Sequence, residues 1–120
     1  MATMVAYTTL ELTKEQKSAL CAAVEKGASE AFNIDISITE LMLMPTIPPQ
    51  CHSPSAKGQI TYFVYTAPTK TDDQKRQLVK NLYDATLNVV GPLEKNKVVV
   101  IIKEHINNNV GVDSIRKSDM

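Results

Sequence analysis

The chain has 120 residues, and its 13 lysine and arginine residues balance 13 aspartate and glutamate residues, so the formal net charge at pH 7 is zero. This length fits one domain, and 43% hydrophobic with 22% charged residues is typical of a globular protein rather than a disordered one. The charge balance leaves no basic face for nucleic acid or for an anionic membrane, so neither is expected as a partner.

The sequence also lacks the signals of other compartments. No apolar run approaches the roughly 20 residues that a membrane-spanning helix needs. The first residues show neither the basic region nor the long apolar core of a secretory signal. The two cysteines, Cys21 and Cys51, do not form a Cys-x-x-Cys pair. We therefore expect a cytoplasmic protein with reduced thiols.

The first part of the chain predicts a strand, a helix and a strand. Residues 3–9 form a strand candidate. Thr13 and Gln16 then show the pattern of a capping box, with a hydroxyl at the N-cap and Gln three residues later. Apolar and small residues follow at helical steps of three and four, at Leu20, Val24, Gly27, Ala28 and Ala31. The helix is expected to end near residue 33, and residues 36–44 are predicted as the second strand.

The second part repeats this order after a proline-rich segment. Residues 45–58 contain four of the six prolines and are interpreted as an ordered connecting loop. Residues 60–66 predict a strand, and a second capping box at Thr71 and Gln74 begins a helix. Its apolar stripe is Leu78, Leu82, Ala85 and Val89. Gly91-Pro92 ends the helix, residues 98–103 form the last strand, and the polar tail 107–120 is expected as a short hairpin or arm.

The two parts are copies of one unit. After a shift of 58 residues, Tyr7-Thr8 falls on Tyr65-Thr66, and Gln16-Lys17 falls on Gln74-Lys75. The helix starts are in register as well. The chain is therefore predicted to be one domain, 1–120, made of two repeats at about 2–45 and 60–105 that are joined by a linker at 46–58.

Each repeat predicts a parallel, right-handed crossover, because a helix lies between its two strands. Two repeats give an α+β fold (α/β in the broad sense) with a four-stranded mixed sheet and both helices on one face. Residues 98–102 and 41–44 are apolar at every position, which is typical of strands buried on both faces. We expect another subunit to cover the second face. The alternatives are a mildly apolar exposed face and a monomeric ferredoxin-like domain, which shares this element order.

The duplicated unit and its helix starts resemble the tautomerase superfamily. The resemblance rests on Thr71-Asp72-Asp73-Gln74-Lys75 and on Thr13-Lys14-Glu15-Gln16-Lys17. Among two-unit members, the length and the last segment, 98–111, look most like the group of cis-3-chloroacrylic acid dehalogenase. The resemblance implies a homotrimer without a cofactor that binds a small carboxylate, a 2-oxo or unsaturated acid. It also implies that the amine of an N-terminal proline acts as general base or acid.

Ala2 stands where this family has its proline. Removal of Met1 would leave a primary amine, for which the ordinary pKa is about 7.7–8.0. Such an amine can act as a base near neutral pH or form a Schiff base with a 2-oxo acid. The alternative is an ordinary or acetylated N-terminus without chemistry. In the second repeat, Ile60 occupies the equivalent position and has no free amine.

Three further residues are site candidates because of their positions. Lys70 precedes the second helix start, where family members place a carboxylate-binding arginine and where a helix N-terminus favours an anion. Glu104 closes the last strand, at the place of the dehalogenases' water-activating carboxylate. Tyr65, or its counterpart Tyr7, can line the pocket. The plain alternatives are a solvated lysine, an exposed glutamate beside His105, and tyrosines that pack with a hydrogen-bonded hydroxyl.

Other positions depart from the family pattern. Lysine at position 70 keeps the charge of arginine but loses its bidentate geometry. Ala67 and Ala28 stand where the dehalogenases carry an arginine and a histidine, which argues against dehalogenation. His105 is interpreted as structural or solvated. Cys51-His52 has no second pair of ligands nearby, so no metal site is predicted.

The sequence thus predicts a binding protein for a small anionic carboxylate with weak or residual keto–enol tautomerase or hydratase activity. Ala2 and Glu104 are the predicted catalytic residues, and Lys70 and Tyr65 are predicted to bind substrate. The activity is expected to be weak because Ala2 replaces the proline. The alternative is a catalytically silent trimer that acts as a binding or signalling module.

Overall fold

The computed structural model describes residues 1–120 and contains two β-α-β units. The first unit consists of β1 (Ala2–Thr8), α1 (Lys14–Phe32) and β2 (Thr39–Leu43). The second unit consists of β3 (Ile60–Thr66), α2 (Asp72–Val90) and β4 (Val98–Glu104). The connecting segment between the units holds only two short 3-10 turns, Pro49–Cys51 and Pro54–Ala56.

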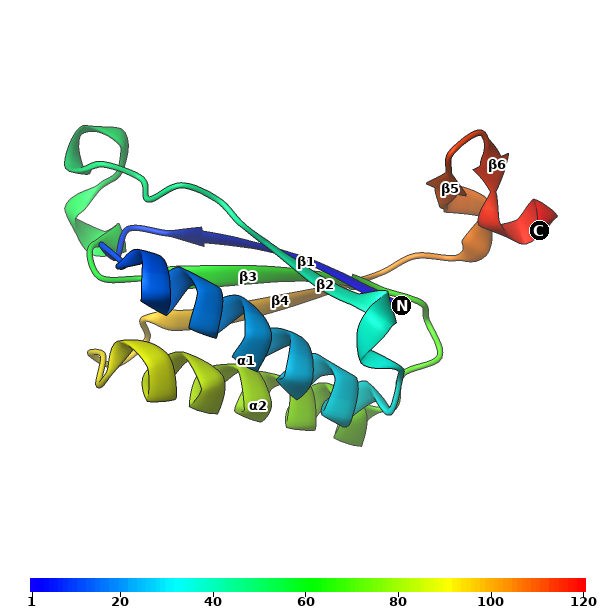
Figure 1. Ribbon diagram of the computed structural model, residues 1–120, viewed down its shortest axis with the longest axis horizontal. Coiled ribbons are helices and arrows are strands. Elements are labelled where there is room, and N and C mark those ends of the chain that lie inside the picture. Colours follow the sequence, from blue (N-terminus) through cyan, green and yellow to red (C-terminus); the bar gives the residue numbers. More distant parts are fainter.

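The four strands form one mixed sheet in the order β2-β1-β3-β4. The strands of each unit pair in parallel, and the two units join through an antiparallel β1–β3 pair. Both helices cover the same face of the sheet (Figure 1). The predicted α+β fold is therefore confirmed. The parallel pairing within each unit excludes the ferredoxin-like alternative.

Both helices begin at the predicted capping boxes. The Thr13 hydroxyl accepts a hydrogen bond from the Gln16 amide at 3.1 Å, and the Gln16 side chain accepts one from the Thr13 amide at 2.9 Å. Thr71 and Gln74 repeat this arrangement with the same two distances. These contacts satisfy amide groups that have no partner within the first helical turn, which is why a four-residue pattern locates each start.

The second strand is shorter than predicted. Ile36–Ile38 forms a 3-10 turn, and extended structure begins only at Thr39. Asp35 accounts for the difference, because its carboxylate accepts a hydrogen bond from the Ser37 amide at 2.8 Å. Such local side-chain bonding competes with strand formation. The second strand is therefore Thr39–Leu43 and not residues 36–44 as predicted.

The core lies between the helices and the sheet. Side chains of α1 and α2 pack on the inner positions of the central strands β1 and β3, and the largest fully buried residues include Met4, Leu20, Ile60, Tyr62, Leu78 and Leu82. The phenol of Tyr62 lies 2.7 Å from the hydroxyl of Thr86, which itself donates to the Leu82 carbonyl at 2.7 Å. Burial raises the pKa of Tyr62 well above its usual value, so this hydroxyl stays neutral.

The opposite face of the sheet has no cover within the chain. One residue from each strand forms an apolar row across this face, in the order Met42, Val5, Phe63 and Ile101. Met42 is 51% exposed and Ile101 is 45% exposed. We call this surface the open sheet face. A continuous exposed apolar row is typical of an interaction surface.

The tail extends beyond the sheet. The strands β5 (Gly111–Val112) and β6 (Ile115–Arg116) form a small hairpin, as the sequence predicts. This hairpin stands away from the body, at the same end of the molecule as the N-terminus (Figure 1). Neither helix has the length and apolarity required to cross a membrane.

The buried Tyr62 hydroxyl provides a test of the core. Tyr62→Phe is expected to lower the free energy of unfolding by about 1 kcal/mol, because it removes one buried hydrogen bond while Thr86 keeps its bond to Leu82. Chemical denaturation measures this change. Tyr7→Phe is the control, because Tyr7 is an exposed tyrosine. An equal effect in both variants would contradict a stabilising role for the Tyr62 hydroxyl.

Candidate functional site

The start of β1 lies in the middle of one end of the sheet. The strand register places Ala2 between Thr39 of β2 and Thr66 of β3, and Thr66 pairs in turn with Glu104 of β4. Ala2 and Thr66 are both 0% exposed. Since neighbouring strands lie about 4.8 Å apart, the backbones of Ala2 and Glu104 are about 10 Å apart. The structure therefore brings the two predicted catalytic residues into one row.

Two lysines act on the amine at the chain start. The pKa of the Met1 amine is lowered from its usual value of 8.0 by partial burial and by the positive charges of Lys70 and Lys117. Neither lysine forms an ion pair within the chain. The amine therefore has a larger neutral, basic fraction near pH 7 than a solvated amine, and the surrounding charge favours an anion.

Lys70 is held at the junction of the two helices. It precedes the N-cap Thr71 of α2, and its ammonium lies 5.3 Å from the ring centroid of Phe32, the last residue of α1. A cation over an aromatic ring is favourable and restricts the lysine without neutralising it. The predicted role of Lys70 as a carboxylate ligand remains a prediction, and its charge lowers the pKa of the Met1 amine.

Glu104 has a partner that the sequence interpretation did not identify. The ammonium of Lys75, in the first turn of α2, lies 2.8 Å from the Glu104 carboxylate. This hydrogen bond is the main cause of a raised pKa for Lys75. In the sequence, Lys75 stands out only as the last residue of the helix-start motif Thr71-Asp72-Asp73-Gln74-Lys75. This ion pair holds the Glu104 carboxylate against the first turn of α2 at the end of β4.

Tyr65 lies on the other side of the sheet. Strand alternation places it on the open sheet face, opposite Thr3 and beside Lys103. Tyr7 lies on the same face and packs against Phe63, with ring centroids 5.9 Å apart. A single chain therefore does not bring Tyr65 to the row that contains Ala2 and Glu104. The assignment of Tyr65 to substrate binding remains a prediction.

Two further polar groups lie at this end, Lys117 in the tail and His105 directly after β4. Lys117 follows β6 and lies close enough to act on the Met1 amine. The backbone amide of His105 donates to the Thr66 carbonyl at 2.9 Å, and its ring Nδ1 is buried without a hydrogen-bond partner in the chain. The sequence analysis did not identify Lys117, because no local pattern connects the tail with a residue more than a hundred positions earlier.

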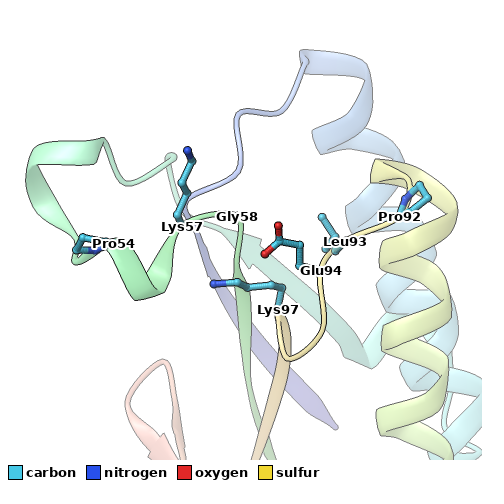
Figure 2. Close-up of a pocket in the computed structure, with 7 residues that line it drawn as sticks. All are labelled: Pro54, Lys57, Gly58, Pro92, Leu93, Glu94 and Lys97. Atoms are coloured by element: carbon cyan, nitrogen blue, oxygen red, sulfur yellow. The ribbon is translucent and has the colours of Figure 1, made fainter.

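The second repeat has no equivalent site at the opposite end of the sheet. A cavity of about 380 Å³ lies there, between the connecting loop and the segment after α2. Lys97 and Glu94 extend toward the segment that carries Lys57 (Figure 2). The backbone continues there through Gly58 into β3. The nitrogen of Ile60, the counterpart of Ala2, is therefore a peptide amide and not a free amine. Leu12, the counterpart of Lys70, packs against the core.

Comparisons with known proteins agree with this architecture. Residues 63–120 match the family model described as "Tautomerase enzyme". The matched range begins within β3 and includes the rest of the second unit and the tail. The sequence matches no curated protein.

Solved structures share the fold over nearly the whole chain. A wild-type fused 4-OT that forms an asymmetric trimer is 17% identical, with a TM-score of 0.85, over 97% of this chain and 96% of that chain. A wild-type fused 4-OT that forms a symmetric trimer is 14% identical, with a TM-score of 0.85, over 98% and 97%. Malonate semialdehyde decarboxylase, which has decarboxylase and hydratase activities, is 16% identical, with a TM-score of 0.78, over 96% and 93%.

The chain therefore has the tautomerase fold. The family model matches residues 63–120 of this chain, and the fold is shared with fused 4-OT and with malonate semialdehyde decarboxylase.

Lys70 and Lys117, whose charges lower the pKa of the Met1 amine, provide a test of this site. Lys70→Ala and Lys117→Ala are each expected to raise the pKa of the N-terminal amine toward 8.0, because the removed charge no longer disfavours the ammonium form. The pH dependence of N-terminal acylation, followed by peptide mass at low ionic strength, measures this pKa. Lys57→Ala, at the opposite end of the sheet, is the control. Identical acylation curves for all variants would show that neither lysine acts on the amine.

Proposed function

We propose that this protein is a tautomerase-superfamily member that binds a small 2-oxo or unsaturated carboxylate and has weak keto–enol tautomerase or hydratase activity. One observation supports this proposal above the others. Lys70 and Lys117 have no ion-pair partners, and their charges lower the pKa of the Met1 amine, at the place where removal of Met1 would leave the amine of Ala2. The finer likeness to the cis-3-chloroacrylic acid dehalogenase group belongs to the proposal and depends on Glu104.

In the proposed reaction, the amine of Ala2 is the base after removal of Met1. The lone pair of the neutral amine takes a proton from the carbon next to the carbonyl of a 2-oxo acid, which gives an enolate and an ammonium. The ammonium then gives this proton to the enolate oxygen. Lys70 and Lys117 hold the substrate carboxylate by charge-assisted contacts. For an unsaturated acid, Glu104 accepts a proton from the water that attacks one carbon of the multiple bond, and the ammonium form of the Ala2 amine gives a proton to the other carbon.

The proposed active form is a homotrimer. The open sheet face has an exposed apolar row, and the fused 4-OT proteins that share this fold form trimers. Burial of that row between copies would stabilise the assembly. Tyr65 lies on the same face, so its proposed contact with substrate would involve a site shared with an adjacent chain.

The open sheet face provides a test of assembly. Ile101→Glu is expected to convert the oligomer to a monomer, because it places a charge in the apolar row that copies would bury. Sedimentation velocity measures the change in mass. Val79→Glu on α2 is a matched control, since Val79 is 44% exposed and Ile101 is 45% exposed. A parent protein that is already monomeric would contradict the proposed trimer.

The activity itself is tested with phenylpyruvate enolisation and hydration of a small acetylenic acid. Lys70→Ala is expected to lower kcat/KM by about tenfold or more, because a charge-assisted contact to the carboxylate contributes about 1.5–3 kcal/mol. N-terminal acetylation is expected to abolish the activity, since the lone pair is then no longer basic. Lys57→Ala is the control.

The Ala2→Pro variant distinguishes a weak enzyme from a silent module. A secondary amine at this position is expected to raise the tautomerase activity well above that of the parent. Absence of turnover in both proteins, with the fold retained, would favour the binding or signalling module instead.

A further inference from the structure

Two threonines occupy equivalent places at the two ends of the central strand pair. The hydroxyl of Thr66, at the end of β3, donates to the Met1 carbonyl at 2.9 Å. The hydroxyl of Thr8, at the end of β1, donates to the Gln59 carbonyl at 2.8 Å. Met1 and Gln59 each precede the first residue of a central strand. The two bonds are therefore related by the internal duplication, and both hydroxyls are nearly or fully buried.

Removal of Met1 changes only one of these two contacts. Gln59 is an internal residue, so Thr8 keeps its acceptor. Thr66 loses its acceptor, and its side chain is 0% exposed while Met1 is in place. A buried hydroxyl without a hydrogen-bond partner is unfavourable. The carbonyl carbon of Met1 is bonded directly to the nitrogen of Ala2, so the cleavage that removes the acceptor creates an amine next to the same hydroxyl.

The primary amine of alanine also needs an external group to orient it. A proline ring fixes the direction of its nitrogen lone pair covalently. The amine of Ala2 rotates about the N–Cα bond among staggered positions, and only some of these direct the lone pair toward the space flanked by Lys70 and Glu104. A fixed hydrogen-bond partner would select among them.

We propose that Thr66 is a positioning residue for the free amine of Ala2. The amine donates one N–H group to the Thr66 hydroxyl oxygen, and the lone pair is left free to accept the substrate proton. This inference rests on the proposed function, in which the Ala2 amine is the base. It extends that function by assigning to a side chain the orienting role that a ring would otherwise have. Thr8, in contrast, only stabilises the connection into β3.

The test compares Thr66→Val, Thr66→Ser and Thr8→Val in the purified protein, with the N-terminal residue established by intact mass. Circular dichroism confirms that each variant is folded. The pKa of the Ala2 amine is measured from the pH dependence of its acylation, and kcat and KM are measured with phenylpyruvate across the same pH range.

Thr66→Val is expected to lower the amine pKa, because an oxygen that accepts from the ammonium form has been removed. It is also expected to lower kcat by about tenfold with little change in KM, because the base is misoriented rather than the substrate lost. Thr66→Ser keeps the hydroxyl and should restore both values. Thr8→Val should change neither the amine pKa nor kcat.

Two results would overturn the inference. The first is an acylation curve and a kcat for Thr66→Val that match those of Thr8→Val. The second is retention of Met1 in the purified protein, because the Thr66 hydroxyl then stays bonded to the Met1 carbonyl. A shifted acylation curve without turnover in the parent would have a different meaning. It would support the hydrogen bond to the amine and contradict the proposed enzymatic activity.

Discussion

The antiparallel pairing of β1 with β3 is the contact on which the rest of the structure depends. Its register runs from Ala2 opposite Thr66 to Thr8 opposite Ile60. Because the pair is antiparallel, each central strand begins where the other one ends. The start of the chain therefore lies beside the segment that leads from β3 into α2, which carries Lys70. The parallel pair of β3 with β4 adds Glu104 to the same row. No single unit could assemble these groups.

The duplication relates the two ends of the sheet to each other, but the residues and the chain connections at the two ends differ. One end has the start of β1, Lys70 and the tail hairpin. At the other end the backbone continues into β3 and Leu12 packs against the core. The cavity at that end is framed by the connecting loop and holds charged side chains of both signs (Figure 2). One candidate site per chain follows from this asymmetry, although the fold has twofold internal symmetry.

Ion pairing separates structural charges from those available to a ligand. Along α2, Arg76 pairs with Asp73 and Lys80 pairs with Asp84, all within one helix. Lys75 reaches across from α2 to pair with Glu104 at the end of β4. Lys70 and Lys117 have no such partner, and both act on the N-terminal amine. An anion would balance these charges, whereas the open sheet face offers an apolar surface.

The sequence by itself determined the features that depend on neighbouring residues. The capping boxes at Thr13 and Thr71 join groups three residues apart, and the repeat order, the helix stripes and the strand β3 followed from local periodicity. The tautomerase fold could be inferred from them, as could the positions of Ala2, Lys70 and Glu104. Tertiary structure alone decided the rest, namely the Lys75–Glu104 pair, the approach of Lys117 to the N-terminus and the bond from Thr66 to Met1. These contacts join residues that are 29 or more positions apart. They depend on strand register and on the docking of the helices. Packing of the whole core sets both of these, and no short segment of the sequence does.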